Sequence, residues 1–386
     1  MNPIFAEMPT TVFDVVSGLA RQHGAVNLGQ GFPESDGPED IRARAAEATL
    51  AGPNQYPPMR GLPELRAAVA EHYGRFQGLD LSPEEVVVTS GATEALAASL
   101  LALISPGDEV VLIQPMYDAY LPLVRLAGGV PRFVSLKPPA WRLTEAALAA
   151  AFTERTRVVV FNDPLNPAAR AFDAEEVALL AGFCRRFDAV AVCDEVWEHV
   201  LFDGRAHHPL IAQPGMRERA VKIGSAGKIF SMTGWKVGFA CAAPRLIEPI
   251  AGAHQFLTFT TPPNLQAAVA YGLGKPAAHF EAMRAGFQRS RDRLAAGLKE
   301  AGFVTLESEG AYFLSIDLAA SGVAVDDQTF CRRAIVEAGV AAIPVSAFYA
   351  EDAVTHVARL CFAKSDATLD AGIERLARAR LLMRGP

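Results

Sequence analysis

Short apolar runs alternate with amphipathic segments along the first two thirds of the chain. The apolar runs lie at residues 85–89, 109–113, 157–161 and 189–193. Helical periodicity marks the segments at residues 92–104, 117–127 and 175–187. Strands that are apolar throughout and are joined by helices are typical of a parallel sheet covered on both faces. We therefore predict an α/β fold, with a three-layer α/β/α domain built on a mostly parallel sheet.

The pattern changes after residue 240. Helical periodicity dominates residues 276–301, and two shorter runs with strand character follow it. A smaller α+β domain fits this pattern. We predict a large domain at residues 41–285 and a small domain that combines residues 1–40 with residues 286–386.

Composition narrows the classes of protein and partner. The chain has 386 residues, of which 51% are hydrophobic and 20% are charged, so it can bury a large core and is not expected to be disordered. Its net charge of −7 and its lack of a basic stripe argue against nucleic acid or an anionic membrane as partner. No apolar run approaches the roughly 20 residues of a membrane-spanning helix. The five cysteines form no C-x-x-C pair, which favours a reduced, cytoplasmic protein without a metal site.

Polar residues follow the predicted strands, at the edge where ligands bind to parallel sheets. Four such segments lie at residues 89–94, 162–167, 193–197 and 223–238. Taken singly, the first three have ordinary explanations: a helix N-cap, an Asn- and Pro-rich loop, and the end of a surface strand. The fourth is unusual because it holds two of the seven lysines in the chain, Lys228 and Lys236.

The four segments together contain the groups that pyridoxal phosphate requires. This cofactor needs a lysine for a Schiff base, a carboxylate beside its pyridinium nitrogen, and a helix N-terminus for its phosphate. Lys228 can supply the amine, Asp194 the carboxylate, and the turn at Gly91 the exposed backbone N–H groups. The spacing of a P-loop is absent, and no G-x-G-x-x-G follows a strand. A nucleotide site therefore has little support.

Several motifs resemble those of the class I aminotransferases, which are fold-type I pyridoxal-phosphate enzymes. The motifs are Asn27-Leu-Gly-Gln-Gly-Phe-Pro33, Asn54-Gln-Tyr56, Ser90-Gly-Ala-Thr-Glu-Ala95, Gly224-Ser-Ala-Gly-Lys228 and Arg359-Leu-Cys-Phe-Ala-Lys364. Together with His254-Gln-Phe-Leu-Thr-Phe259, they are most similar to the branch of bacterial methionine aminotransferases, kynurenine aminotransferases and glutamine transaminase K. The resemblance implies pyridoxal phosphate as cofactor, and amino acids and 2-oxo acids as substrates.

The resemblance also implies a role for each residue that contacts the cofactor. Lys228 would form the Schiff base, and Asp194 would hold the pyridine nitrogen protonated. Asn166 would bind the phenolic oxygen, and Tyr117 would stack on the ring. The phosphate would be held by Gly91, Ala92, Thr93, Ser225 and Lys236.

A homodimer is implied as well, with each active site at the subunit interface. Tyr56 would reach the phosphate bound by the neighbouring subunit. Arg359 would bind the substrate α-carboxylate as a bidentate fork, assisted by Asn166 and the backbone N–H of Gly31. The implied reaction is a ping-pong transamination in which Lys228 moves the α-proton of the substrate.

The sequence departs from the family pattern in three places. Trp197 stands where the family usually has a tyrosine whose hydroxyl contacts the cofactor, and an indole can donate a hydrogen bond but cannot accept one. Lys236 stands where many relatives have arginine. Ala168 and Ala169 replace the common Thr-Gly or Leu-Gly pair. The change at Trp197 alters the predicted surroundings of the cofactor most.

The predicted amino donor is apolar, aromatic, methionine-like or glutamine-like. Residues 255–264, which in this family help to form the side-chain pocket from the partner subunit, contain no Arg or Lys. Phe259 and Phe348 also favour an apolar pocket. A cysteine-S-conjugate β-lyase uses the same cofactor and stays open as an alternative. A regulatory module that only binds the cofactor is disfavoured, because no basic DNA-binding extension is present.

Overall fold

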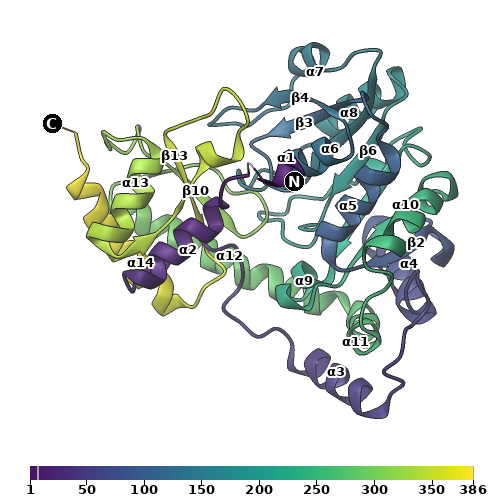
Figure 1. Ribbon diagram of the computed structural model, residues 1–386. Helices are drawn as coiled ribbons and strands as arrows, with labels where there is room; N and C mark the ends of the chain where they lie inside the picture. The colour runs from purple at the N-terminus through teal and green to yellow at the C-terminus, as the bar shows by residue number, and fades with distance from the viewer. Residues whose placement is uncertain (7, 386) are drawn as a thin grey trace.

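The computed structural model describes residues 1–6 and 8–385. A seven-stranded sheet forms its centre, in the order β2-β8-β7-β6-β5-β3-β4 (Figure 1). The strands are β2 Val86–Thr89, β3 Glu109–Gln114, β4 Val130–Ser135, β5 Thr156–Asn162, β6 Val190–Asp194, β7 Ala220–Ser225 and β8 Gly238–Cys241. Pairing is parallel from β4 through β7, whereas β8 runs antiparallel to both β2 and β7. The predicted mostly parallel sheet is therefore confirmed.

Helices cover both faces of this sheet, because successive strand residues point to opposite sides. On β5, Val158 and Val160 pack into one core cluster with α5, α6 and α10, whereas Val159 and Phe161 pack into another with α7 and α8. The helices of this region are α3 Glu39–Ala51, α4 Pro63–Gln77, α5 Gly91–Leu103, α6 Tyr120–Leu126, α7 Glu145–Ala151, α8 Ala174–Arg186, α9 Ala226–Ile229, α10 Pro244–Leu257 and α11 Pro263–Leu273. This arrangement confirms the predicted three layers.

A second region holds a four-stranded antiparallel sheet in the order β12-β13-β10-β9. Its strands are β9 Val304–Thr305, β10 Phe313–Asp317, β12 Ile343–Pro344 and β13 Val357–Cys361. Its helices are α12 Ala277–Glu300, α13 Asp327–Arg333 and α14 Asp366–Leu382, and α2 Val12–Gln22 lies beside them (Figure 1).

The N-terminal segment joins this second region rather than the large sheet. Strand β1, Val26–Asn27, pairs in parallel with β11, Val340–Ala341. The short helix α1, Pro3–Ala6, contacts α6 of the large region. The exact limits of the two domains stay a prediction.

Most predicted elements lie within a residue or two of the observed ones. The helix expected at residues 117–127 begins only at Tyr120, because Tyr117 lies in the loop between β3 and α6. All five cysteines are buried and free. Within the described ranges, no helix combines the length and the apolar character that crossing a membrane demands.

Candidate active site

A cavity of about 240 Å³ opens at the carboxyl ends of β5, β6 and β7, beside the start of α5. Its lining comes from segments that are far apart in the chain. The lining residues are Gly91, Ala92, Thr93, Leu96, Tyr117, Tyr120, Asn162, Asn166, Asp194, Val196, Trp197, Ser225, Lys228, Thr233 and Lys236. The structure thus brings together every residue predicted to contact the cofactor from within one chain.

Lys228 lies in α9, the short helix that follows β7. Its Nζ donates a hydrogen bond to the Tyr312 hydroxyl at 3.0 Å and lies 4.6 Å from the centre of the Trp197 ring. Burial lowers the pKa of Lys228 to about 8, although the nearby carboxylate of Asp194 opposes this change. A lysine with such a pKa is partly neutral near physiological pH, and a neutral amine can act as nucleophile and base.

Asp194 is the last residue of β6, and its carboxylate is buried. One oxygen, Oδ2, accepts a hydrogen bond from the Tyr120 hydroxyl at 2.6 Å. The other, Oδ1, has no hydrogen-bond partner in the described part of the chain. Burial raises the pKa of Asp194, and the hydrogen bond from Tyr120 and the charge of Lys228 counteract it in part. An unpartnered acceptor in a cavity fits the protonated nitrogen of a pyridine ring.

The start of α5 forms a compact cradle of backbone. Gly91 has a φ of +76°, and a Cβ there would lie 3.1 Å from the Lys236 Nζ. A Cβ on Gly238 would lie only 2.5 Å from the carbonyl carbon of Gly91, so that position accepts no side chain. The first N–H groups of a helix have no partner within the helix. With the Lys236 ammonium beside them, the N–H groups of Ala92 and Thr93 fit a phosphate.

Arg359 lies on β13 and is almost fully buried. Its Nη1 donates to Asn166 Oδ1 at 2.8 Å, and its Nη2 donates to the Gly29 carbonyl at 2.9 Å. The guanidinium stacks on Phe313 at 4.1 Å from the ring centre and lies 5.3 Å from Phe348. Burial lowers the pKa of Arg359 to about 10. A buried cation with no carboxylate bound to it in the described chain suits an anionic group of a ligand.

Two predicted residues lie outside this assembly. Tyr56 and Phe259 contact each other edge to face at 5.5 Å. Their exposed fractions are 84% and 39%, and neither belongs to the cavity lining within the described chain. Gly31 lies nearer, because a Cβ there would come within 3.8 Å of Arg359 Nη2.

The contacts that three residues of this site make were not predicted from the sequence. Tyr120 orients Asp194, and Asn162 donates from Nδ2 to the Asp194 backbone carbonyl at 2.7 Å. The Tyr312 hydroxyl accepts a hydrogen bond from Lys228, the proposed reacting lysine. Asn162 stands at a strand end, which could have revealed it. The two tyrosines lie in apolar segments, where the sequence pattern predicts that an aromatic side chain belongs to the hydrophobic core.

A separate cluster of buried charges joins β7 to the segment that follows β6. Lys222 on β7 is fully buried, and its Nζ donates to Glu195 at 2.5 Å and to Glu198 at 3.0 Å. Tyr73 donates to the same Glu198 at 3.0 Å. Burial alone would lower the pKa of Lys222, but the two carboxylates raise it above its ordinary value. Within the described ranges, no cluster of three or more His, Cys, Asp or Glu side chains could hold a metal ion.

Known proteins resemble this chain over nearly its whole length. Residues 24–376 match the family model described as aminotransferase class I and II. The probable N-succinyldiaminopimelate aminotransferase of Mycobacterium tuberculosis is 44% identical over 380 residues, covering 95% of each chain. The methionine aminotransferase of Escherichia coli is 40% identical over 371 residues, covering 96% of each chain. Human kynurenine–oxoglutarate transaminase 1 is 37% identical over 394 residues, covering 93% of each chain.

Solved structures give the same result. The M. tuberculosis N-succinyldiaminopimelate aminotransferase superposes with a TM-score of 0.94 over 97% of this chain and 99% of its own. The E. coli methionine aminotransferase gives a TM-score of 0.94 at 40% identity over 97% of this chain and 98% of its own. Aspartate aminotransferase from Thermus thermophilus gives 0.91 at 32% identity, over 98% and 99%. These matches confirm the resemblance predicted from the motifs.

Proposed function

Because the chain belongs to the class I and II aminotransferases, which depend on pyridoxal phosphate, we propose that it transfers the amino group of an apolar, aromatic, methionine-like or glutamine-like amino acid to a 2-oxo acid. The proposed order is ping-pong, so the first 2-oxo acid leaves before the second one binds. One observation carries the proposal. The Lys228 amine and the unpartnered oxygen of Asp194 line one cavity, together with the start of α5.

The site residues proposed for the cofactor fit its ring nitrogen and its phosphate. Asp194 would pair with the ring nitrogen, and the N–H groups of Ala92 and Thr93 would bind the phosphate with Ser225 and Lys236. Bound pyridoxal phosphate supplies an electron-accepting ring that stabilises negative charge at the substrate α-carbon.

Lys228 is proposed to move the α-proton. Its pKa of about 8 lets Nζ take up and return a proton near neutral pH. The amine lies beside the cavity rather than in solvent, so it meets the substrate from a fixed direction. That placement reduces the entropy lost when the reacting atoms meet.

Arg359 is proposed to bind the substrate carboxylate. Two of its nitrogens donate hydrogen bonds to Asn166 and to the Gly29 carbonyl, and these bonds fix the position of the guanidinium before a ligand binds. Its Nε has no partner in the described chain. A fixed cation orients the α-carbon of the substrate relative to Lys228.

The donor side chain is proposed to extend toward a larger cleft that borders Phe348. This cleft has a volume of about 1390 Å³, and Val12, Met116 and Leu121 contribute to its lining. Those side chains support an apolar donor. Two arginines, Arg125 and Arg332, also line it, so N-succinyldiaminopimelate, after which the 44%-identical relative is named, is a second candidate donor.

We further propose a cytoplasmic homodimer in which Tyr56 completes the site of the partner subunit. The support is its position, since Tyr56 is 84% exposed and packs against Phe259 away from its own cavity. A large exposed aromatic pair is typical of an interface. Sedimentation of the purified protein as a monomer would contradict this assembly.

A panel of amino donors tests the proposed reaction. The purified protein with pyridoxal phosphate would receive methionine, glutamine, leucine, phenylalanine, kynurenine, N-succinyldiaminopimelate or aspartate, each with several 2-oxo acids. We expect the highest kcat/KM with a donor from the apolar, aromatic, methionine or glutamine group. Fastest turnover of aspartate would contradict the proposed donor class. Pyruvate and ammonia released from S-substituted cysteines without a 2-oxo acid would reveal β-elimination instead.

A further inference from the structure

We propose that Tyr312 is a positioning residue for Lys228, whose hydroxyl holds the lysine amine by accepting one of its N–H groups. This inference deepens the proposed function, because it rests on Lys228 as the reacting amine. Tyr312 stands immediately before β10, far from Lys228 in the chain. Lys228 lies in α9, which follows β7 of the large sheet, so this contact joins the two regions of the molecule.

Two hydrogen bonds fix the direction of the Tyr312 hydroxyl. It donates its single proton to the Gly31 carbonyl at 2.8 Å and accepts from the Lys228 Nζ at 3.0 Å. A phenol has one proton, so Tyr312 cannot also donate to the lysine lone pair. A neutral Lys228 therefore keeps an N–H on Tyr312 and retains a free lone pair for chemistry. Among the residues that the structure describes, Tyr312 supplies the only side-chain hydrogen bond to this amine.

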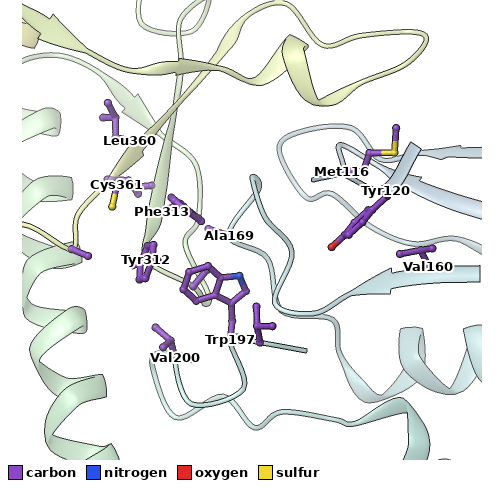
Figure 2. Close-up of a cluster of buried hydrophobic side chains, with 14 of the residues drawn as sticks. Met116, Tyr120, Val160, Ala169, Trp197, Val200, Tyr312, Phe313, Leu360 and Cys361 are labelled. Carbon is purple, nitrogen blue, oxygen red and sulfur yellow. The ribbon is translucent and has the colours of Figure 1, made fainter. Parts of the chain in front are cut away.

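Packing holds the Tyr312 ring in place. The ring is 1% exposed and meets Trp197 edge to face, with centres 4.2 Å apart and planes at 84°. Phe313 and Phe287 lie at 5.1 and 5.8 Å from it. Figure 2 shows Trp197 and Tyr312 side by side. A ring fixed on several sides loses little entropy when its hydroxyl binds the amine.

Trp197 cannot replace this hydroxyl. The centre of its ring lies 4.6 Å from Lys228 Nζ, so the ring attracts the ammonium group. The face of a ring does not orient an N–H group as an oxygen lone pair does. Its indole nitrogen can only donate. The accepting oxygen beside Lys228 therefore comes from Tyr312.

The same contact ties the lysine to the N-terminal segment. Tyr312 bonds Gly31, and Arg359 bonds Gly29 two residues earlier. The amine and the proposed carboxylate-binding group are therefore both anchored to residues 29–31. A displacement of this segment would disturb both ends of the substrate site at once.

Tyr312→Phe removes the hydroxyl and keeps the ring. Protein freed of cofactor would be mixed with pyridoxal phosphate, and the rate of covalent capture at Lys228 would be followed by absorbance from pH 6 to 10. The hydroxyl stabilises the charged amine, so we expect its loss to lower the midpoint of the rate profile by about one pH unit. The plateau rate should fall about tenfold, because the amine is no longer held.

The control is Tyr271→Phe, which removes a hydroxyl that binds Asp40 on the surface and should leave midpoint and plateau unchanged. Equal profiles for Tyr312→Phe and the parent protein would overturn the role of Tyr312. Failure of the parent protein to capture the cofactor at all would instead overturn the proposed function.

A measurement on the unaltered protein does not depend on whether the variant folds. With tyrosines labelled at Cζ with ¹³C, the Tyr312 resonance should titrate with a midpoint near the Lys228 pKa of about 8. The same titration should vanish in Lys228→Met. A Tyr312 resonance that does not respond across this range would overturn the proposal.

Discussion

Lys222 and Lys228 lie six residues apart, and neither extends into bulk solvent, yet their surroundings are opposite. Lys222 meets two carboxylates, Glu195 and Glu198, and its pKa is raised. Lys228 has a neutral hydroxyl as its hydrogen-bond partner, and burial lowers its pKa to about 8. The strand end between them separates a structural ion cluster from the proposed reaction site.

The comparison shows that depth alone does not make a lysine reactive. Desolvation lowers the pKa of both amines, but a hydrogen-bonded carboxylate pair outweighs it at Lys222. The charge of Asp194 also raises the pKa of Lys228, against the effect of burial. However, Asp194 makes no hydrogen bond to that amine in the described structure. The hydrogen-bond partners thus decide which lysine has a raised pKa and which a lowered one.

The largest expected effect is loss of turnover in Lys228→Met. Without the amine the protein lacks both the proposed covalent anchor for the cofactor and the proposed base, so kcat/KM should fall by at least about 10⁴-fold. Steady-state assay with the best donor measures this effect, and circular dichroism checks that the fold is retained. Activity within tenfold of the parent protein would assign the chemistry elsewhere.

Lys222→Met should act on stability instead. It leaves Glu195 and Glu198 buried without their cation, which costs about 3–5 kcal/mol in the free energy of unfolding. Urea titration of the cofactor-free protein measures the change. Lys299→Met is a suitable control, because Lys299 is exposed on α12 and should shift stability by less than about 0.5 kcal/mol. Equal midpoints for both variants would show that the ion cluster contributes little.

The smallest effect concerns pH and has the opposite sign. The pKa of Lys228 falls from 10.5 when unfolded to about 8 when folded, so between these values the unfolded chain binds more protons. Stability of the cofactor-free parent protein should then rise with pH relative to Lys228→Met. Below pH 8 the methionine variant should be the more stable of the two, by up to about 3 kcal/mol, and this difference should shrink toward pH 10.5.

Urea titrations of both proteins at several pH values measure that difference. A constant difference across the range would mean that Lys228 keeps its ordinary pKa. For Lys222→Met the deficit should stay large up to the unfolded-state pKa of lysine, since the folded pKa is raised.

Local patterns in the sequence were sufficient to predict strands β2, β3, β5 and β6 and the class of enzyme, whereas β4, β7 and β8 were not predicted. Asp194 ends β6, Asn166 follows β5 and Lys228 follows β7, so the parallel topology brings them to one edge. The family model confirms the predicted family. The roles assigned to individual residues stay predictions.

Hydrogen bonds between segments that lie far apart in the chain could not be predicted from local patterns. Tyr120 lies 74 residues from the Asp194 that it binds, and Tyr312 lies 84 residues from Lys228. Both tyrosines fit the apolar patterns of their own segments, so nothing local marks their hydroxyls as functional. The buried partners of Lys222 were hidden for the same reason, because an ion cluster inside a core has no sequence period.

The antiparallel strand β8 also has a consequence for synthesis of the chain. Strand β2 has one neighbour in the sheet, β8, which aligns Thr89 with Gly238. The N-terminal part of a nascent chain leaves the ribosome first, so β2 has no native strand to pair with until β8 has emerged. Only then does Gly238 come to rest against Gly91. The proposed phosphate site is thus completed only after β8 has been synthesised, and a chain that stops before β8 would leave an unpaired apolar strand available for aggregation.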